Sequence, residues 1–545
     1  MVDLASRAPL PPITKAKSAG GDNALMLVFL LVAAVLSLLP ILRVEIPPLL
    51  DYPNHYARLW LISGGAQDPV MAAMYRIDWG AAWTNVLTDM IAASVGPILP
   101  LQVLSRLLLA LGLLMPAIGL TALNRALFGG LHWWNIVCMI LVWNVIFLAG
   151  FLNFSIGLGL ALLLAAGDLH LASRSLVLRL AYRAASSALL LIAHPFALLF
   201  FVLLQAAMAF GPHLSLLADR SLWKPMLGRV LAACTPCFIP LLVLLAFGPA
   251  LPGSNSAAGQ GGTVWSEISL TNAISVLLTY FKTYDLQVDA VYVVLFAGLI
   301  GLACLRRRLS AHAGLLLVAG LLAVVSPFIP VSYRATGAID LRLPSMMVLA
   351  LAAGVRLRLF EAGRDRLVLA SLALVLVASR MIVVDRVWSE AEKNIAAVEA
   401  AVADLPPGAK LLPLQDTGDK ALNSQAPSGR FLGRNMPLHW HYGSLAVVRE
   451  KAFIPTLFTA AGKQPITVLP PYTEISVPEG VPPTVDLLTK PVQAAFPYLA
   501  DWTHRFDYIL VLNADQPNAA GPMTNLPNLV SVADKGFARL YRIAR

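Results

Sequence analysis

The acid Asp51 is the residue of this chain whose type and position best suit chemistry. It stands in the segment Leu50-Asp51-Tyr52-Pro53-Asn54-His55, directly after the first long apolar stretch. If that stretch crosses a bilayer, Asp51 lies at the membrane surface opposite the N-terminus, where lipid-linked substrates present their head groups. A carboxylate there can act as a general base that removes the proton of an attacking hydroxyl.

The residues after this acid predict a short interfacial helix. Pro53 suits an opening turn, and Gly64-Gly65 ends the helix. Asn54 and His55 fall beside Arg58 at helical spacing, so the helix has a polar face next to the acid. An acid before a proline-initiated helix is also a common N-cap, and this structural role is the alternative to catalysis.

Few charged residues stand on the same outer side, and each is a candidate for binding substrate. Arg342 and Arg334 could hold a phosphate by paired hydrogen bonds, or they could anchor a helix end at the interface. Lys282 ends the amphipathic segment 270–284, and Glu267 is a further acid that assists, binds metal or is merely solvated. The sequence has no clustered zinc ligands, Walker loop, nucleophile elbow or nucleic-acid-binding pattern.

Composition shows which elements must position these residues. The chain is 58% hydrophobic and 13% charged, with a mean hydropathy of +0.73, whereas soluble domains are about 25% charged. We therefore predict an α-helical polytopic membrane protein of about eleven transmembrane helices. The predicted spans are residues 24–42, 98–123, 133–150, 153–171, 177–193, 195–211, 229–248, 287–305, 311–331, 343–360 and 366–384.

The distribution of basic residues orients these spans. With 177–193 counted as a short span, 17 Lys and Arg residues fall on the N-terminal side of the membrane and 7 on the other side before residue 384. The positive-inside rule then places the N-terminus in the cytoplasm and the C-terminus outside. Without this span the segregation of charge would be lost.

The chain divides by composition into three parts. Residues 1–23 form a cytoplasmic tail, residues 24–384 a transmembrane domain, and residues 385–545 a periplasmic α/β domain, in which 506–512 reads as a strand and 529–543 as a hairpin. Within the transmembrane domain, the outer loops 43–97 and 249–286 are long enough to carry function. The glycine-rich tract in the second loop is either a lid over a lipid substrate or a linker.

This layout, with a first outer loop that bears an acid and a periplasmic C-terminal domain, resembles the GT-C superfamily of membrane glycosyltransferases. The segment from Asp51 to Arg58 is similar to the first-loop acidic motif of that superfamily, and Arg342-Leu343-Pro344 resembles the arginine-containing start of a late span that holds the donor phosphate. The chain lacks the adjacent Asp-Glu pair of the mannosyltransferases and shows no clear Trp-Trp-Asp motif of oligosaccharyltransferases. The resemblance therefore leaves the acceptor open.

The resemblance implies an inverting transfer of sugar from a polyprenyl-phosphate donor to a glycan, lipid or protein acceptor at a bacterial inner membrane, with Asp51 as general base. The phosphate leaving group needs positive charge rather than a second acid, which Arg342 and Lys282, with Arg58 or Arg334, would supply. Membrane lipids are expected partners and nucleic acid is not. The resemblance fixes no cofactor, and a divalent metal is left open.

Two other functions compete with this one. A polysaccharide or lipid transport subunit, or a scaffold, would not be an enzyme, and transporters commonly carry ionisable residues at mid-membrane depth. The predicted spans are nearly free of charge, which favours the enzyme. An O-antigen-type polymerase would instead use a lipid-diphosphate glycan.

The predicted topology can be tested with reporter fusions. Fusions after residues 212 and 308 should report a cytoplasmic location, and a fusion after residue 384 a periplasmic one, because an odd number of spans separates the two ends. Paired alkaline phosphatase and fluorescent protein reporters provide the measurement. A cytoplasmic signal after residue 384 would show that 177–193 does not cross the membrane.

Overall fold

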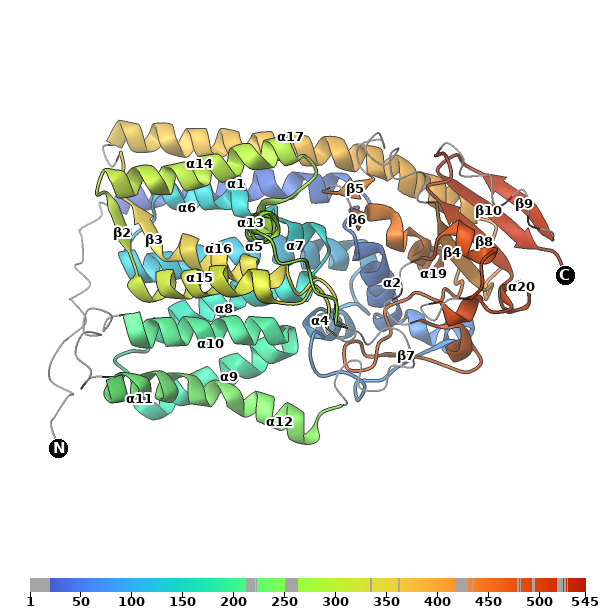
Figure 1. Cartoon of the computed structure of the whole chain (residues 1–545), viewed down its shortest axis with the longest axis horizontal. Coiled ribbons are helices and arrows are strands. Elements are labelled where there is room, and N and C mark those ends of the chain that lie inside the picture. Colours follow the sequence, from blue (N-terminus) through green and yellow to red (C-terminus); the bar gives the residue numbers. More distant parts are fainter. Residues whose placement is uncertain are drawn as a thin grey trace.

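The computed structural model shows a bundle of long helices joined to a smaller domain that contains a sheet (Figure 1). The two ends of the chain lie at opposite ends of the long axis. The residues that the structure describes are 20–211, 221, 223–249, 263–333, 336–360, 363–416, 430–433, 436–477, 480, 482–492, 496–516, 523, 526 and 528–545. Arg334 and the glycine-rich tract of the second outer loop, where we expected a lid or a linker, lie outside them.

The apolar stretches of the sequence form the helices of the bundle. In the described part of the chain, seven helices are long and apolar enough to cross a membrane. Four shorter apolar helical segments coincide with the other predicted spans, so the predicted membrane class is confirmed. The main helices are α1 (Gly20–Arg43), α5 (Leu101–Phe128), α8 (Leu152–His170), α9 (Leu176–Ala193), α10 (Pro195–Phe210), α11 (Trp223–Cys234), α12 (Ile239–Phe247), α14 (Leu286–Leu305), α15 (Ala313–Val325), α16 (Arg342–Ala353) and α17 (Gly363–Val402).

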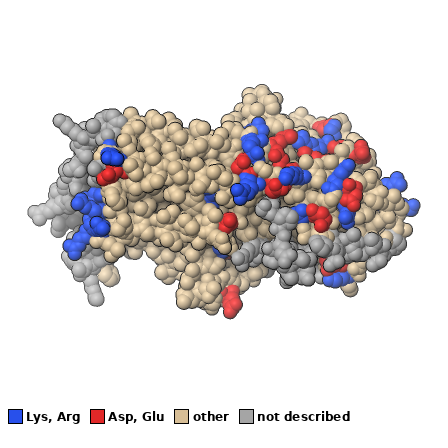
Figure 2. All heavy atoms as spheres, turned by 90° about the horizontal axis from the view of Figure 1, so that it is seen from above, with Lys and Arg blue, Asp and Glu red and all other residues tan. Residues whose placement is uncertain are grey.

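The surface of the bundle is that of a protein embedded in lipid. Figure 2 shows a broad band almost without charged side chains, with basic residues gathered at one end and mixed charges at the other. The basic end holds the antiparallel pair of β2 (Leu309–Ala311), which follows three arginines, and β3 (Val355–Leu357), which contains Arg356. This segregation has the pattern from which we predict that this end faces the cytoplasm.

The predicted span 133–150 is not one continuous helix. It consists of α6 (Trp133–Val137), the 3₁₀ turn η3 (Cys138–Val142) and α7 (Val145–Leu148), all buried among other helices. At the break, the side-chain oxygen of Asn144 accepts hydrogen bonds from the amides of Ile146 and Phe147, and its amide donates to two carbonyls of η3. Irregular backbone is tolerated at membrane depth when such partners satisfy it, so one asparagine explains the departure.

The first outer loop carries two short helices at the junction between the bundle and the C-terminal domain (Figure 1). These are α2 (Tyr52–Ile62) and α4 (Leu87–Val95). The predicted start at a proline and stop before Gly64 are confirmed, since Pro53 occupies the opening turn and Ser63 caps the end. Strand β1 (Tyr75–Ile77) of this loop pairs antiparallel with β7 (Ile466–Val468), which ties the loop to the C-terminal domain.

The C-terminal domain is built on a mixed four-stranded sheet with the strand order β4-β8-β10-β9. Strands β4 (Leu411–Gln415) and β8 (Tyr508–Leu512) are parallel, while β9 (Leu529–Asp534) and β10 (Ala538–Ile543) form the predicted hairpin. The boundary expected at residue 385 falls inside α17, which runs unbroken for 40 residues. Between β4 and β8 lie β5 (Phe431–Leu432), β6 (Met436–Pro437), the 3₁₀ helix η9 (Leu438–Ser444) and α19 (Leu445–Arg449).

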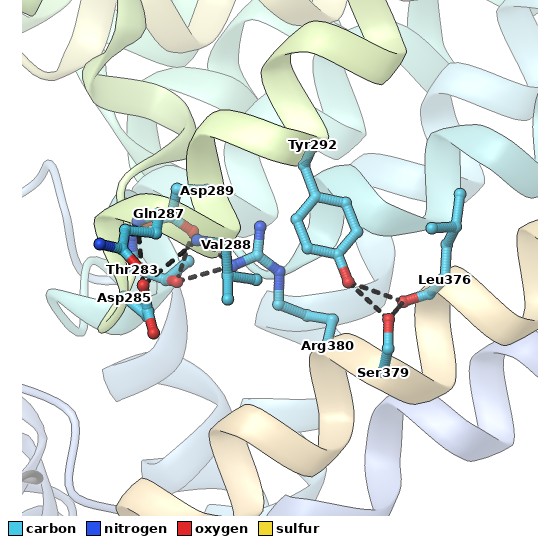
Figure 3. Close-up of polar contacts among 9 residues, drawn as sticks. All are labelled: Thr283, Asp285, Gln287, Val288, Asp289, Tyr292, Leu376, Ser379 and Arg380. Atoms are coloured by element: carbon cyan, nitrogen blue, oxygen red, sulfur yellow. Dashed lines mark hydrogen bonds and ion pairs between the residues drawn. The ribbon is translucent and has the colours of Figure 1, made fainter.

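The spans are less free of charge than the sequence suggested, because two ion pairs are buried among them. Arg183 binds Asp168 through two hydrogen bonds of 2.8 and 2.9 Å, joining α8 to α9. Arg380 of α17 binds Asp289 of α14 at 2.5 Å, and its guanidinium lies 4.1 Å from the ring centre of Tyr292 (Figure 3). Each charge faces an opposite charge, so these residues join helices.

Removing one partner of the α14–α17 pair should destabilise the chain strongly. Asp289 also accepts hydrogen bonds from the amide and hydroxyl of Thr283, and Asp289→Ala leaves the buried Arg380 without its counter-charge. We expect a loss of about 3–5 kcal/mol of unfolding free energy, measured by thermal unfolding in detergent. The exposed cap Asp285 is the control, since Asp285→Ala should cost only about 1 kcal/mol. Equal melting of the two variants would contradict a stabilising role.

Candidate active site

A cavity of about 630 Å³ lies where the outer ends of the helices meet the C-terminal domain. Its wall combines residues of α2, the α9–α10 turn, the start of α16 and segments of the C-terminal domain. The titratable side chains in its wall are Asp51, His55, Arg58, His194, Arg342, His441 and Lys463. The structure therefore brings Asp51 and Arg342, which are 291 positions apart in the sequence, to one site.

Close backbone packing fixes the position of Asp51. Its amide donates to the carbonyl of Ala149 at 3.1 Å, and a Cβ atom on Gly150 would lie 3.1 Å from that amide nitrogen. Gly150 also has a φ of +85°, so glycine is needed there for two reasons. The side chain of Asp51 makes no capping hydrogen bond to α2. The capping alternative is thus not observed, and the carboxylate faces the cavity.

A histidine of the C-terminal domain stands next to this carboxylate. His441 lies in η9, and its Nε2 is 3.5 Å from Oδ1 of Asp51. Its Nδ1 is 3.3 Å from the side-chain nitrogen of Asn54. Burial lowers the pKa of His441 to about 3, so the ring is neutral at physiological pH.

Asn54 was expected to bind substrate but faces away from the cavity. Its side-chain oxygen accepts from the amide of Phe458 at 2.8 Å, and its nitrogen donates to the carbonyl of Thr456 at 2.9 Å. With the contact to His441, this fully buried amide holds α2 against the C-terminal domain. In this structure Asn54 therefore has a structural role.

The other expected residues of α2 reach the cavity wall. Arg58 is held by Asp89 of α4 through two hydrogen bonds of 2.8 and 3.1 Å, so a carboxylate already offsets its charge. His55 lies edge-on to the ring of Phe458. Burial, together with nearby Arg58 and His441, holds the pKa of His55 well below its usual value. His55 is therefore a neutral polar group of the wall.

Arg342 is the first residue of α16 and is almost fully buried. Its guanidinium carbon lies 5.0, 5.7 and 6.0 Å from the ring centres of Phe196, Phe151 and Phe154. The faces of aromatic rings attract a cation electrostatically. The arginine therefore puts positive charge in the cavity wall in a fixed orientation.

Two expected residues stand outside the cavity wall as the structure describes it. Lys282 donates to the hydroxyl of Ser275 at 2.9 Å, within the same segment of the outer loop. Glu267 is exposed just before α13 (Leu270–Leu278). The second outer loop thus contributes neither of its predicted charges to the cavity, because its helix packs along the bundle.

The C-terminal domain contributes residues to the cavity wall that were not predicted from the sequence. Lys463 and Gln464 lie in the cavity wall beside Trp440 and His441. The run of histidine and aromatic residues from 439 to 442 in a mostly polar segment was a signal for this site. His194 accepts a hydrogen bond from the amide of Phe196 and also lines the cavity.

The residues described here do not suit a divalent metal. Among the described residues of the cavity wall Asp51 is the one carboxylate, and Asp89 behind it is bound by Arg58. Within the described part of the chain no group of three His, Cys, Asp or Glu residues could hold a metal ion. Magnesium and calcium need several oxygen ligands, and a single carboxylate in the described wall does not supply them.

Comparisons with known proteins find likenesses among solved structures alone. Neither the protein families nor the curated proteins give a match. Two crystal structures of ArnT from Cupriavidus metallidurans are similar to the chain. The structure bound to undecaprenyl phosphate has 12% identity and a TM-score of 0.45 and covers 95% of this chain and 98% of that one. The apo structure has 13% identity and a TM-score of 0.47, with coverages of 96% and 98%. Both likenesses are at low sequence identity, and the activity is inferred below from the chain's own residues.

Proposed function

We propose that this chain is an inverting glycosyltransferase. It would move a sugar from a polyprenyl-phosphate donor to an acceptor hydroxyl at the periplasmic face of the inner membrane. The observation that supports this most is the presence of the Asp51 carboxylate and the Arg342 guanidinium in the wall of one cavity. A base and a cation are the two groups that such a transfer needs, since the leaving phosphate is already a weak base.

In the proposed step, the acceptor oxygen attacks the anomeric carbon from the face opposite the phosphate. The new carbon–oxygen bond forms as the bond to the phosphate oxygen breaks, and the electron pair of that bond leaves on the phosphate. Asp51 takes the hydroxyl proton. Arg342, joined by Lys463 from the C-terminal domain, stabilises the negative charge of the phosphate.

The surroundings of the cavity suit a lipid-linked donor. An apolar groove of about 790 Å³ lies between α4, α9 and α12, and it shares Leu191 and Leu244 with the cavity wall. Tryptophans 79 and 83 stand in the same groove. An isoprenoid chain could lie there with its phosphate in the cavity, because apolar walls favour the chain and the cations favour the head group.

Replacement of Asp51 tests the proposed base. Asp51→Asn conserves size but cannot accept the proton, so transfer should fall by about 10²-fold or more. The measurement compares envelope glycans and lipids of cells that lack the gene and cells complemented with the wild type or the variant. Asp78→Asn is the matched control, because the side chain of this outer-loop acid is 40% exposed and, in the described contacts, meets only Gly80 and Arg76 of its own turn. Full complementation by Asp51→Asn would remove the general base and favour transport or a scaffold.

Replacement of Arg342 tests the proposed phosphate site separately from catalysis. Arg342→Gln should weaken binding of polyprenyl monophosphate by about 10- to 100-fold, the range for one hydrogen bond between charged groups. Bound ligand stabilises the folded state by mass action, so the rise of the melting temperature with added lipid phosphate reports the affinity. Arg76→Gln, at an exposed outer arginine, should leave the rise unchanged. An unchanged rise in Arg342→Gln would move the phosphate site elsewhere.

A further inference from the structure

The C-terminal domain places the titratable side chain of His441 3.5 Å from the Asp51 carboxylate. His441 comes from η9, more than 380 positions later in the chain, and its side chain is 3% exposed. Its ring packs edge-on against Phe458 with centres 4.9 Å apart, which limits its rotation. The two ring nitrogens face different partners, Asn54 on one side and Asp51 on the other.

The contacts of Asn54 decide which nitrogen of His441 carries the proton. The oxygen of Asn54 accepts from the amide of Phe458, and a backbone amide can only donate, so the other end of the side chain must be its NH₂ group. That NH₂ group faces Nδ1 of His441, which therefore acts as the acceptor. A neutral imidazole then carries its hydrogen on Nε2, the atom 3.5 Å from Asp51.

We propose that His441 is a positioning residue that donates its Nε2–H to Asp51 and so orients the carboxylate toward the acceptor hydroxyl. This inference rests on the proposed function of Asp51 as general base. Hydrogen bonds of this kind are often long in an empty site and tighten when substrate binds. The C-terminal domain thereby completes the active site, and it does so through the same α2 contacts that dock it.

The proposed hydrogen bond should affect the pKa of Asp51. A neutral donor stabilises the ionised carboxylate and lowers its pKa, so loss of the donor should raise the pKa of Asp51. The other titratable groups that face the cavity are Arg58, paired with Asp89, together with His55, His194, Arg342 and Lys463. Of these groups, His55 also responds to a change at residue 441, so the effect of the histidine is read from the protonation of the Asp51 carboxyl itself.

Two amide substitutions of the histidine separate positioning from packing. In His441→Gln the amide nitrogen falls near the place of Nε2 and can still donate to Asp51. In His441→Asn the shorter side chain reaches only the place of Nδ1, and the donor is lost. We expect His441→Asn to lower the rate of product formation in complemented cells by about 10- to 100-fold and His441→Gln to retain most of it. His439→Gln is the matched control, since His439 lies in the same turn but is outside the cavity wall as described.

A spectroscopic measurement needs no substrate. Infrared difference titration of the full chain in lipid nanodiscs follows protonation of the Asp51 carboxyl, which the Asp51→Asn variant identifies by its missing band. The midpoint should move to higher pH in His441→Asn and stay near the wild-type value in His441→Gln and His439→Gln. In the Asp51→Asn background, His441→Asn should cause no further loss of product, because the histidine acts through that carboxylate.

The outcomes separate this proposal from the proposed function. A midpoint that does not move in His441→Asn overturns the positioning role, as does an equal loss of product in His439→Gln, which would show a merely structural effect. If cells lacking the gene show no change in glycans while the midpoint still shifts, the hydrogen bond stands and the transferase is wrong. Loss of product together with the shifted midpoint, in His441→Asn alone, supports both.

Discussion

The cavity depends on the hydrogen bonds of the buried Asn54 side chain, which hold two of its walls together. This side chain joins α2 of the first outer loop to residues 441, 456 and 458 of the C-terminal domain, and all of its polar atoms find partners there. A buried amide left without such partners would cost about 1–3 kcal/mol for each lost bond. The docked arrangement is therefore specific. Because Asp51 lies just before α2 and His441 across from it, the same amide sets the distance between them.

Other contacts at this junction add charge but less specificity. Arg449 of α19 binds both Glu45 and Glu399 at 2.7 Å, and Lys451 binds Asp68 at 2.6 Å. These ion pairs are partly exposed, and such pairs typically contribute about 0–1 kcal/mol. The buried amide and the β1–β7 pairing thus determine how the domain sits, while the ion pairs surround that contact.

The sequence predicted the elements better than it predicted the site. Apolar length and charge bias are strong local signals, so the helices at 177–193 and 195–211 could be placed in advance. Asp51 and Arg342 stood out because charged residues are rare beside apolar stretches. Lys463 and His441 could not be assigned this way, since polar residues are ordinary in a soluble domain and only tertiary packing brings them to the membrane part. Lys282 of the second outer loop was expected at the site but lies outside the cavity wall as described. Its ammonium group instead donates to Ser275, a residue close to it in the chain.

The unbroken α17 connects the two halves of the molecule mechanically. A helix of 40 residues is about 60 Å long, roughly twice the hydrocarbon thickness of a bilayer, and Figure 1 shows it running from the bundle into the C-terminal domain. The half of α17 beyond the membrane packs in the C-terminal domain, so the length of the helix sets the distance of that domain from the bilayer. A change in bilayer thickness that tilts α17 would therefore act on the contacts of Asn54, which hold Asp51 and His441 together.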